Sequence, residues 1–347
     1  MRNVTVRRLG LALVPIVVGL AVQAREITDM AGRKVTIPDN ITRVYSAQPY
    51  TSVALYVVAP DLVINLQPGC FPMGPAENRF LRPGTTGLPT ELTNAVQGEH
   101  NQLSLENILA LKPDFALAKG GPATDPSRLE QQFARINLPV VFVDLDGATA
   151  YPAGIEFLGR LLGREERAAK LSAYATRLLA EVEKAVAAIP PAERVRVYYA
   201  ESEDGLATES EASFHTDPIR LAGGVIVHKG DLKTHFGMEK VSLEQVLLYN
   251  PDVIVALVPE FAEKVTQDAR WKDVKAVKEK RVYAVPRTPF NWVDRPPSIM
   301  QIIGIPWLAQ RFYPQRYTVD IRQETREFLR LFMGVEATDA DLNEWLK

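Results

Sequence analysis

The sequence predicts an α/β protein built from two similar lobes, and the first observation behind this is an internal repeat. Residues 104–118 recur in looser form at residues 242–256, which is 138 positions further along. Each copy is typical of a helix capped by serine with glutamate in its first turn, followed by a Pro-Asp break and a short aliphatic run. Such an apolar run is typical of a strand buried in a parallel sheet. The repeat therefore indicates two lobes of related structure.

The second observation is an alternation of strand-like and helix-like segments in a chain of 347 residues, a length that favours about two domains. This alternation predicts mainly parallel sheets with helices on both faces, as in Rossmann-like lobes. Besides the repeat copies, the predicted elements are an entry strand segment at 26–38, strand 43–46, helix 51–58, an apolar run at 62–66, helix 128–136 and strands 140–143, 195–200 and 282–285.

The third observation is a helical segment between the copies, at residues 151–190. Leucine and valine recur there every three to four residues, and Pro190 and Pro191 end the pattern. We expect one long rigid α-helix, with or without a short helix before it, that permits only modest closure of a ligand cleft between the lobes. The predicted domains are a signal peptide at 1–24, an N-terminal lobe at 25–150, the linking helix at 151–190, and a C-terminal lobe at 191–347 that ends in a helical segment.

The N-terminus has the pattern of a secretory signal peptide. Three arginines precede an apolar segment at residues 9–22, and the small residues after it predict a cut after Ala24. The segment is shorter than the roughly 20 residues that span a bilayer, so an uncleaved anchor is the weaker alternative. No cysteine follows it that could carry a lipid, and the single cysteine, Cys70, has no disulfide partner. These features predict a secreted, periplasmic protein.

Composition and motifs exclude several classes of function. Without the three arginines of the signal peptide, 37 basic residues face 42 acidic ones, a balance near −5. Such a surface disfavours nucleic acid or an anionic membrane as partner. The sequence contains no phosphate loop, nucleophile elbow or helix-borne zinc motif, and carboxylate pairs such as Glu201 and Glu203 are interpreted as surface groups. We therefore expect a binding protein with no cofactor of its own, and not an enzyme.

The signal peptide, the two SLExxLxxxPDxxxA copies and the helical link together resemble the periplasmic substrate-binding proteins of iron-siderophore, cobalamin and metal-chelate ABC importers. The likeness spans nearly all of the mature chain and includes segments at residues 27–33, 221–224, 281–285 and 328–335. The resemblance implies a monomer that captures a small-molecule cargo between its lobes. It also implies that the protein delivers this cargo to the permease dimer of an ABC transporter.

Glu106 and Glu244 are the glutamates of the two repeat copies. The resemblance implies that each projects from its lobe and meets basic residues of the permease. A purely structural role is the alternative, because the helix macrodipole favours an acidic side chain in the first turn by about 0.3–1 kcal/mol. Ser242 and Gln245 also fit a capping box.

The cargo site is predicted in loops at the C-terminal ends of the strands, where ligands of open α/β sheets bind. Glycine there lets backbone N–H groups approach a ligand, and an aromatic face beside a guanidinium suits an anionic chelate or oxyanion. Turn or packing roles, and a pair between Arg295 and Asp294, are the alternatives. The candidate contacts are Tyr50, Gly120, Gly121, Thr208, His215, Trp292 and Arg295.

The histidine pattern bears on the kind of cargo. No two of the four histidines lie four residues apart, so a compact zinc cage made by the protein alone is disfavoured. If a side chain does hold a metal, the candidates are His215 and Tyr50, whereas Cys70 is interpreted as packing. We expect a ferric siderophore or another metal chelate first. Molybdate or tungstate is second, because a tetrahedral dianion needs only N–H donors and one arginine, and cobalamin or haem follows.

Overall fold

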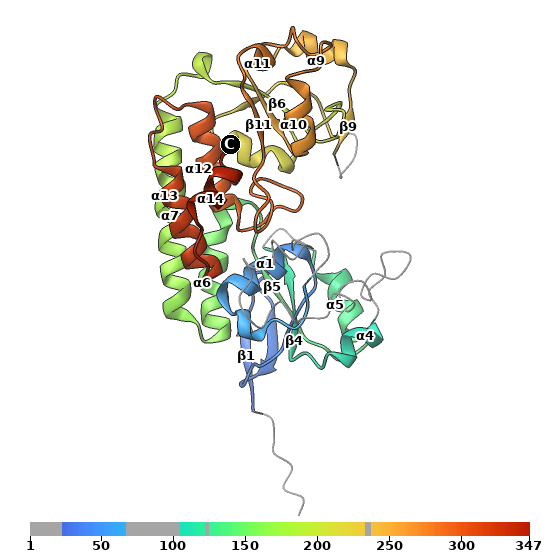
Figure 1. Cartoon of the computed structure of the whole chain (residues 1–347). Helices are drawn as coiled ribbons and strands as arrows, with labels where there is room; N and C mark the ends of the chain where they lie inside the picture. Colours follow the sequence, from blue (N-terminus) through green and yellow to red (C-terminus); the bar gives the residue numbers. More distant parts are fainter. Residues whose placement is uncertain (1–22, 67–104, 122–124, 233–236) are drawn as a thin grey trace, which may run out of the picture.

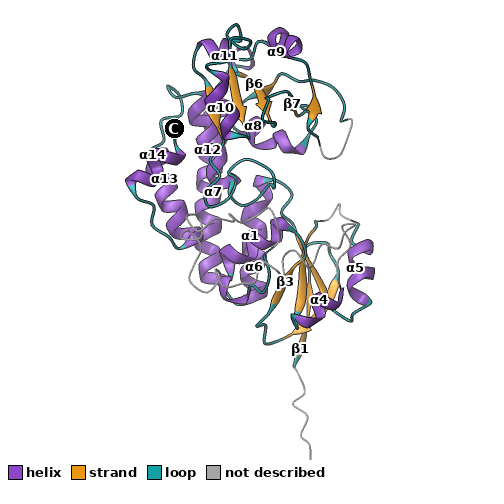
Figure 2. Ribbon diagram, turned by 45° about the vertical axis from the view of Figure 1, so that its right-hand side comes forward, coloured by secondary structure: helices purple, strands orange, loops and turns teal. Residues whose placement is uncertain are grey.

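The structure is a computed structural model that describes residues 23–66, 105–121, 125–232 and 237–347. Two α/β lobes lie one above the other, and a layer of helices runs along one side of both (Figure 1). The turned view separates the sheet of the N-terminal lobe from that of the C-terminal lobe (Figure 2). The predicted α/β fold with two lobes and mainly parallel sheets is confirmed. Cys70 lies outside the described residues.

The N-terminal lobe is built around a parallel sheet of three strands. Their order is β3 (Val44–Ser46), β4 (Phe115–Lys119) and β5 (Val140–Val143). All four residues of β5 are buried, as expected of an unbroken apolar strand covered on both faces. The other elements are the antiparallel pair β1 (Ala24–Thr28) and β2 (Lys34–Pro38), with α1 (Pro49–Val58), α4 (Leu105–Ala110) and α5 (Ser127–Ala134).

The C-terminal lobe repeats this plan with one more strand. Its parallel sheet has the order β11 (Val282–Ala284), β10 (Val253–Ala256), β6 (Arg196–Ala200) and β8 (Val225–Ile226). An antiparallel pair, β7 (Ala207–Thr208) and β9 (Glu239–Lys240), lies beside it. The helices are α8 (Asp217–Leu221), α9 (Leu243–Tyr249), α10 (Pro259–Val265) and α11 (Lys275–Lys278).

The two copies of the repeat predicted from the sequence have matching structures, and the match extends to single hydrogen bonds. In each copy, the residue before the Pro-Asp pair has positive φ, 48° at Lys112 and 41° at Asn250, and so ends the helix. The aspartate then accepts from the backbone at the start of the neighbouring strand. Oδ2 of Asp114 accepts from N of Arg43 at 2.8 Å, and Oδ2 of Asp252 accepts from N of Arg196 at 2.8 Å. The Pro-Asp pair therefore fastens each helix end to the strand that comes first in the chain within the parallel sheet of its lobe.

The helical link is two helices, α6 (Tyr151–Leu162) and α7 (Glu165–Ala187). Gly163 separates them, with a φ of 65° that ends α6 in the left-handed conformation. The two helices pack closely, because a Cβ on Gly159 would lie 2.3 Å from Cβ of Ala168. The long helix that was expected is α7, and the short helix before it is α6.

The C-terminal segment returns along the linking helices. It contains α12 (Gln301–Phe312), α13 (Ile321–Phe328), a π turn (Leu329–Met333) and α14 (Asp339–Trp345). Nη2 of Arg167 on α7 donates to the carbonyl oxygens of Leu331 and Phe332, each at 3.2 Å. We call α6, α7, α12 and α13 together the spine, because they form the layer beside both lobes (Figures 1 and 2).

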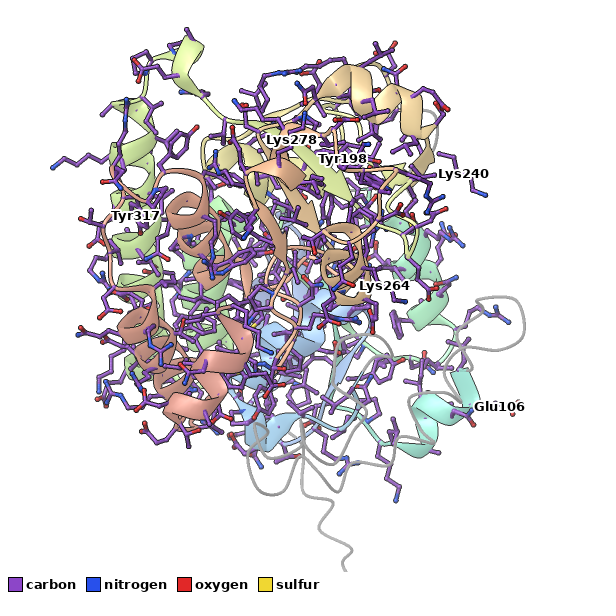
Figure 3. All side chains as sticks on the ribbon, turned by 45° about the horizontal axis from the view of Figure 1, so that its top comes forward. Glu106, Tyr198, Lys240, Lys264, Lys278 and Tyr317 are labelled. Carbon is purple, nitrogen blue, oxygen red and sulfur yellow. The ribbon has the colours of Figure 1, made fainter. Side chains whose placement is uncertain are left out.

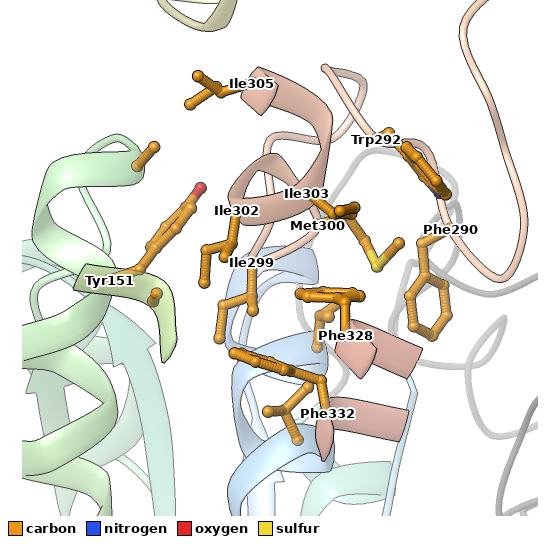
Figure 4. Close-up of a cluster of buried hydrophobic side chains, with 14 of the residues drawn as sticks. Tyr151, Phe290, Trp292, Ile299, Met300, Ile302, Ile303, Ile305, Phe328 and Phe332 are labelled. Carbon is orange, nitrogen blue, oxygen red and sulfur yellow. The ribbon is translucent and has the colours of Figure 1, made fainter. Parts of the chain in front are cut away.

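One hydrophobic core runs through the spine into both lobes. It includes Val44 and Val141 of the N-terminal sheet and Val197 and Val255 of the C-terminal sheet. Figure 4 shows its central part, where side chains from α6, α12 and α13 meet. The outer face of each sheet has a smaller cluster of its own. Because the inner faces share one core with the spine, large independent movements of the lobes would expose packed side chains.

Candidate functional site

Loops from both lobes converge around Tyr151, at the start of α6. Burial raises the pKa of its phenol, and the negative charge of Asp294 in the C-terminal lobe raises it further. Tyr50 and Asp146 of the N-terminal lobe and Asp217 of the C-terminal lobe add smaller effects of the same sign. Groups from four separate loops are therefore close enough to act on one phenol. We call this region the junction, and it lies where the sequence predicts the cargo site.

On the N-terminal side, Tyr50 is the second residue of α1 and is half-buried. Nζ of Lys119 lies 4.9 Å from the centre of its ring and pairs with Asp146 at 3.0 Å. The backbone N of Lys119 donates to Oε1 of Gln48 at 2.6 Å. These contacts join the loops after β3, β4 and β5. Tyr50 and Lys119 thus present one ring and one paired cation to the junction.

A buried hydroxyl network fixes the turn from β3 into α1. Oγ of Ser46 lies 2.7 Å from Oγ1 of Thr51 and accepts from Ser52 at 2.9 Å. Asn65 closes the network, because it accepts from N of Ser46 at 2.8 Å and donates to its carbonyl oxygen at 2.9 Å. The turn holds the N-terminus of α1 at the end of β3, and such an end carries partial positive charge. Our sequence analysis missed this network, since serine and threonine are common at helix starts.

Gly120 and Gly121 follow β4 and are both buried. N of Gly120 donates to the carbonyl oxygen of Val143 at 2.9 Å, which extends the pairing of β4 with β5. A Cβ on Gly121 would lie 2.8 Å from Cγ of Asp144. The missing side chain at Gly121 therefore has a packing reason, namely the close approach of Asp144.

On the C-terminal side, His215 and Asp294 form a buried pair. Nδ1 of His215 lies 2.7 Å from Oδ2 and 2.9 Å from Oδ1 of Asp294. The carboxylate is fully buried and the histidine is 6% exposed. Within the described ranges, Nε2 of His215 has no hydrogen-bond partner. A carboxylate on one ring nitrogen fixes the ring and leaves the other nitrogen for a ligand.

Arg295 is held between two buried glutamates. Its Nε lies 2.6 Å from Glu201 and its Nη2 lies 2.5 Å from Glu209. Asp294, the partner considered from the sequence, is further away at 3.8 Å. Burial raises the pKa of Glu201 to about 8, although the hydrogen bond from Arg295 opposes this shift. Arg295 is thus neutralised within its own lobe.

The interpretation of Glu201 as a surface carboxylate is wrong, because its side chain is completely buried whereas Glu203 is exposed. Glu209 was not considered at all. The two glutamates are 94 and 86 positions from Arg295, so no local pattern joins them. The signal for Glu201 in the sequence was its position directly after the apolar residues of β6, where buried residues are expected.

Trp292 and Thr208 do not offer a surface to the junction. Trp292 is fully buried, its Nε1 donates to the carbonyl oxygen of Thr288 at 2.9 Å, and its ring lies beside Phe290 and Met300 (Figure 4). Thr208 is 1% exposed within β7. Their placement therefore supports packing, which was the alternative for the residues of these loops. Tyr50, Gly120, Gly121, His215 and Arg295 are the candidates that remain around the junction.

A separate hollow of about 620 Å³ lies between α7 and the two lobes. It is lined by Pro152 and Ala153 of α6, by Leu179 of α7 and by Arg194 and Arg220 of the C-terminal lobe, among others. None of the cargo contacts predicted from the sequence lines it. The hollow therefore adjoins the junction, because Arg220 pairs with Asp217, but it does not contain the predicted cargo contacts.

Glu106 and Glu244 are exposed in the first turns of α4 and α9. Figure 1 shows both helices on the side of the molecule away from the spine, one in each lobe, and Glu106 is labelled at the surface in Figure 3. Oγ of Ser242 accepts from N of Gln245 at 3.2 Å, so Ser242 caps α9 as half of the predicted capping box. A hydrogen bond from its own backbone N–H, followed by one from Ser242, lowers the pKa of Glu244.

In the described part of the chain, no three histidine, cysteine, aspartate or glutamate side chains are grouped so that they could hold a metal ion. The same residues include no helix that is long and apolar enough to cross a membrane. The junction instead gathers a histidine, a phenol, a helix N-terminus and several paired charges.

The family follows from a match over more than half of the chain. The model of the periplasmic binding proteins covers residues 80–289. The chain belongs to this family. It is also 29% identical over 340 residues to the molybdate-binding protein MolA of Haemophilus influenzae, a match that covers 90% of this chain and 92% of that protein.

Solved structures agree with the fold of this periplasmic binding protein. An ABC transporter solute-binding protein from Sulfurospirillum deleyianum is 37% identical with a TM-score of 0.80, and the match covers 92% of this chain and 98% of that one. The molybdate-bound MolA of Haemophilus influenzae is 26% identical with a TM-score of 0.68, covering 90% and 99%. The protein therefore binds a small-molecule cargo and works with an ABC transporter, and its relatives are solute-binding proteins and not enzymes.

Proposed function

We propose that this periplasmic binding protein captures a tetrahedral oxyanion of the molybdate and tungstate class at the junction and delivers it to an ABC permease. The observation that carries this proposal is the His215–Asp294 pair, in which Asp294 holds Nδ1 and Nε2 has no hydrogen-bond partner among the described residues. Asp294 acts on the same phenol, Tyr151, as Tyr50 and Asp146 of the N-terminal lobe. In the imidazolium form Nε2–H donates to an oxyanion while Asp294 balances the charge of the ring. The N-terminus of α1 supplies a second, dipolar donor.

The charge pattern of the junction supports a small cargo. Its charged side chains already have partners, namely Lys119 with Asp146, Arg220 with Asp217, and Arg295 with two glutamates. A large, highly charged chelate would need unpaired charges along its surface. A small dianion needs only a few N–H and O–H donors aimed at its oxygens.

The relatives give independent support for an oxyanion. MolA of Haemophilus influenzae is described as molybdate-binding and was solved with molybdate bound. The similarity to it extends over nine-tenths of this chain, so it includes both lobes and the spine. The similarity to MolA therefore favours an oxyanion as the cargo of this chain.

A ferric siderophore or another metal chelate, the first expectation from the sequence, is the second candidate. One observation favours it: a carboxylate that holds Nδ1 of a histidine is the arrangement typical of histidines that ligate a metal through Nε2. In the neutral form with Nδ1–H, Nε2 of His215 would accept a metal and could not donate to an oxyanion. The two candidates thus require opposite protonation states of one ring.

A binding screen separates the candidates. The protein from Arg25 onward would be titrated by calorimetry with molybdate, tungstate, sulfate, ferric siderophores, a corrinoid and haem. We expect saturable binding of molybdate and tungstate. At a free oxyanion concentration a hundred times Kd, binding should raise the free energy of unfolding by about 2.7 kcal/mol. Saturable binding of a ferric chelate without a response to either oxyanion would overturn the proposal.

We also propose that Glu106 and Glu244 meet basic residues of the permease dimer, as the resemblance implies. Each is exposed on its own lobe, and neither has an ion-pair partner among the residues that the structure describes. Uptake by cells that carry Glu106→Arg and Glu244→Arg should be lost while the cargo affinity of the purified double variant is unchanged. Loss of cargo binding in that variant would contradict a docking role.

For localisation, we propose export to the periplasm with cleavage after Ala24. The first strand begins at Ala24, so this cut would remove only its first residue. N-terminal sequencing of the protein from a periplasmic fraction should start at Arg25. A product that retains the apolar segment at residues 9–22 would support the uncleaved anchor instead.

A further inference from the structure

The two repeat helices carry more than a glutamate in common. Leu109 lies three residues after Glu106 in α4, and Leu247 lies three residues after Glu244 in α9. Both pairs keep the repeat spacing of 138 positions. Side chains three residues apart lie on the same side of a helix, so each helix presents a carboxylate next to a leucine.

The exposure of the two helices is equally well matched. Residues 105–110 and 243–248 have the same order of exposed, half-buried and buried positions. In each helix one residue is fully buried, Ile108 in α4 and Val246 in α9. The leucine that follows remains exposed, 49% at Leu109 and 37% at Leu247. A large apolar side chain is thus exposed to solvent at the same position on both lobes.

The C-terminal copy has an additional apolar side chain. Leu248 is 78% exposed and occupies the position of Ala110 in the first copy. Single exposed leucines are ordinary on protein surfaces. Three of them beside the two exposed repeat glutamates, in helices that otherwise differ in sequence at several positions, form a pattern that packing among the described residues does not explain.

We propose that each glutamate and its neighbouring leucine form one docking epitope, and that the C-terminal epitope, with Leu247 and Leu248, is the stronger anchor. The partner is the transporter permease, so this inference rests on the proposed docking role of Glu106 and Glu244. The chemistry that fits each epitope is a basic side chain bordered by an apolar pocket. The apolar contact excludes water from the ion pair, which strengthens a contact that is weak when exposed.

The test measures how the protein stimulates ATP hydrolysis by its ABC transporter reconstituted in vesicles. The variants are Leu109→Ser and the double variant Leu247→Ser with Leu248→Ser, both with intact glutamates. The protein concentration for half-maximal stimulation should rise about threefold to tenfold for the first and by about tenfold or more for the second. Cargo affinity, measured by calorimetry with molybdate, should not change in either.

Leu221→Ser is the matched control, because Leu221 is also 37% exposed but lies at the end of α8, outside both repeat helices. It should stimulate like the wild type. Normal stimulation by the leucine variants, while reversal of Glu106 and Glu244 abolishes it, would overturn the epitope and leave glutamate docking intact. Normal stimulation by the glutamate variants as well would overturn docking itself. An equal loss in Leu221→Ser would also overturn the epitope, because any exposed leucine would then have the effect.

Discussion

The two lobes are most alike where they face outward and least alike where they face each other. Outside, α4 and α9 share the exposed glutamate, the exposed leucine and the Pro-Asp fastening to the first strand. At the junction, the N-terminal lobe offers a helix start set by a hydroxyl network. The C-terminal lobe instead buries carboxylates against a histidine and an arginine.

This difference separates two demands on a duplicated chain. A partner with two like halves can bind two like surfaces, so the outward helices had reason to stay similar. A small asymmetric cargo is held by a few side chains on a shared scaffold, so the facing loops were able to diverge. Five predictions test this contrast, and the one with the largest expected effect concerns the buried charges of the C-terminal lobe.

Arg295→Met should lower the free energy of unfolding by about 3–5 kcal/mol, because it leaves the buried Glu209 without its cation and the buried Glu201 without its hydrogen-bond donor. The comparable change in the N-terminal lobe, Lys119→Met, should cost about 0–1 kcal/mol, since Asp146 is exposed. Urea unfolding followed by tryptophan fluorescence measures both. Equal losses would show that the C-terminal charges are no more structural than those of the N-terminal lobe.

The same cluster predicts a pH dependence. The folded pKa of Glu201 is raised to about 8, above its value in the unfolded chain, so the folded state holds this proton more tightly. The resulting stability is fully present below the unfolded pKa and is lost as pH rises through about 8. In Glu201→Gln, unfolding curves measured between these limits should decline less steeply than in the wild type. An unchanged slope would mean that another group binds the proton.

His215→Asn should weaken cargo binding by about 10- to 100-fold, because it removes the charge-assisted hydrogen bond that the ring would donate to the oxyanion. The matched control is His228→Asn, because His228 is also a buried histidine paired with a carboxylate, Glu239 at 3.1 Å. Unlike Asp294, the partner of His215, Glu239 is not among the groups that raise the pKa of Tyr151. Calorimetry with molybdate should therefore show near wild-type affinity for the His228 variant. A similar loss in both would assign the effect to the stability of the lobe.

The sequence was sufficient for the elements whose signals are local. Unbroken apolar runs form the strand at residues 140–143 and the strands of the repeat copies. Such runs can be recognised as strands from the local sequence alone. A short helix before the long one was left open, and the position of the break at Gly163 was not predicted, because apolar spacing continues on both sides of it. Its signal was the glycine directly after the last leucine of α6, a common helix end.

The candidate site was harder to predict because its contacts are distant in sequence. Arg295 was predicted as a cargo contact, but its two glutamate partners, which lie in another part of the lobe, could not be read from the sequence. Carboxylates are rarely buried, so a general rule placed Glu201 at the surface. Trp292 was read as a loop aromatic, although a Cβ on Gly304 would lie 1.9 Å from its carbonyl oxygen, so this loop packs directly on α12.

The outward similarity predicts equal sensitivity of the two fastenings. Asp114→Ala and Asp252→Ala each remove a carboxylate that accepts from the backbone of the neighbouring strand. Each should lower the free energy of unfolding by about 1–2 kcal/mol, because the pair of Asp252 with Lys275 at 2.8 Å is matched by the bond that Asp114 accepts from N of Thr42 at 2.6 Å. Urea unfolding measures both. A difference above about 2 kcal/mol would mean that the copies no longer play the same structural part.

The smallest effect is expected at Tyr50, where the N-terminal lobe faces the cargo. Tyr50→Phe keeps the ring that lies near Lys119 and removes only the hydroxyl, so packing and the cation contact should survive. Molybdate affinity should fall by no more than about threefold to tenfold, the worth of one hydrogen bond. A loss as large as that of His215→Asn would mean that the phenol is a principal ligand. The cargo would then be held equally by both lobes, and the metal chelate would become the better candidate, because a phenolate and an imidazole together suit a metal.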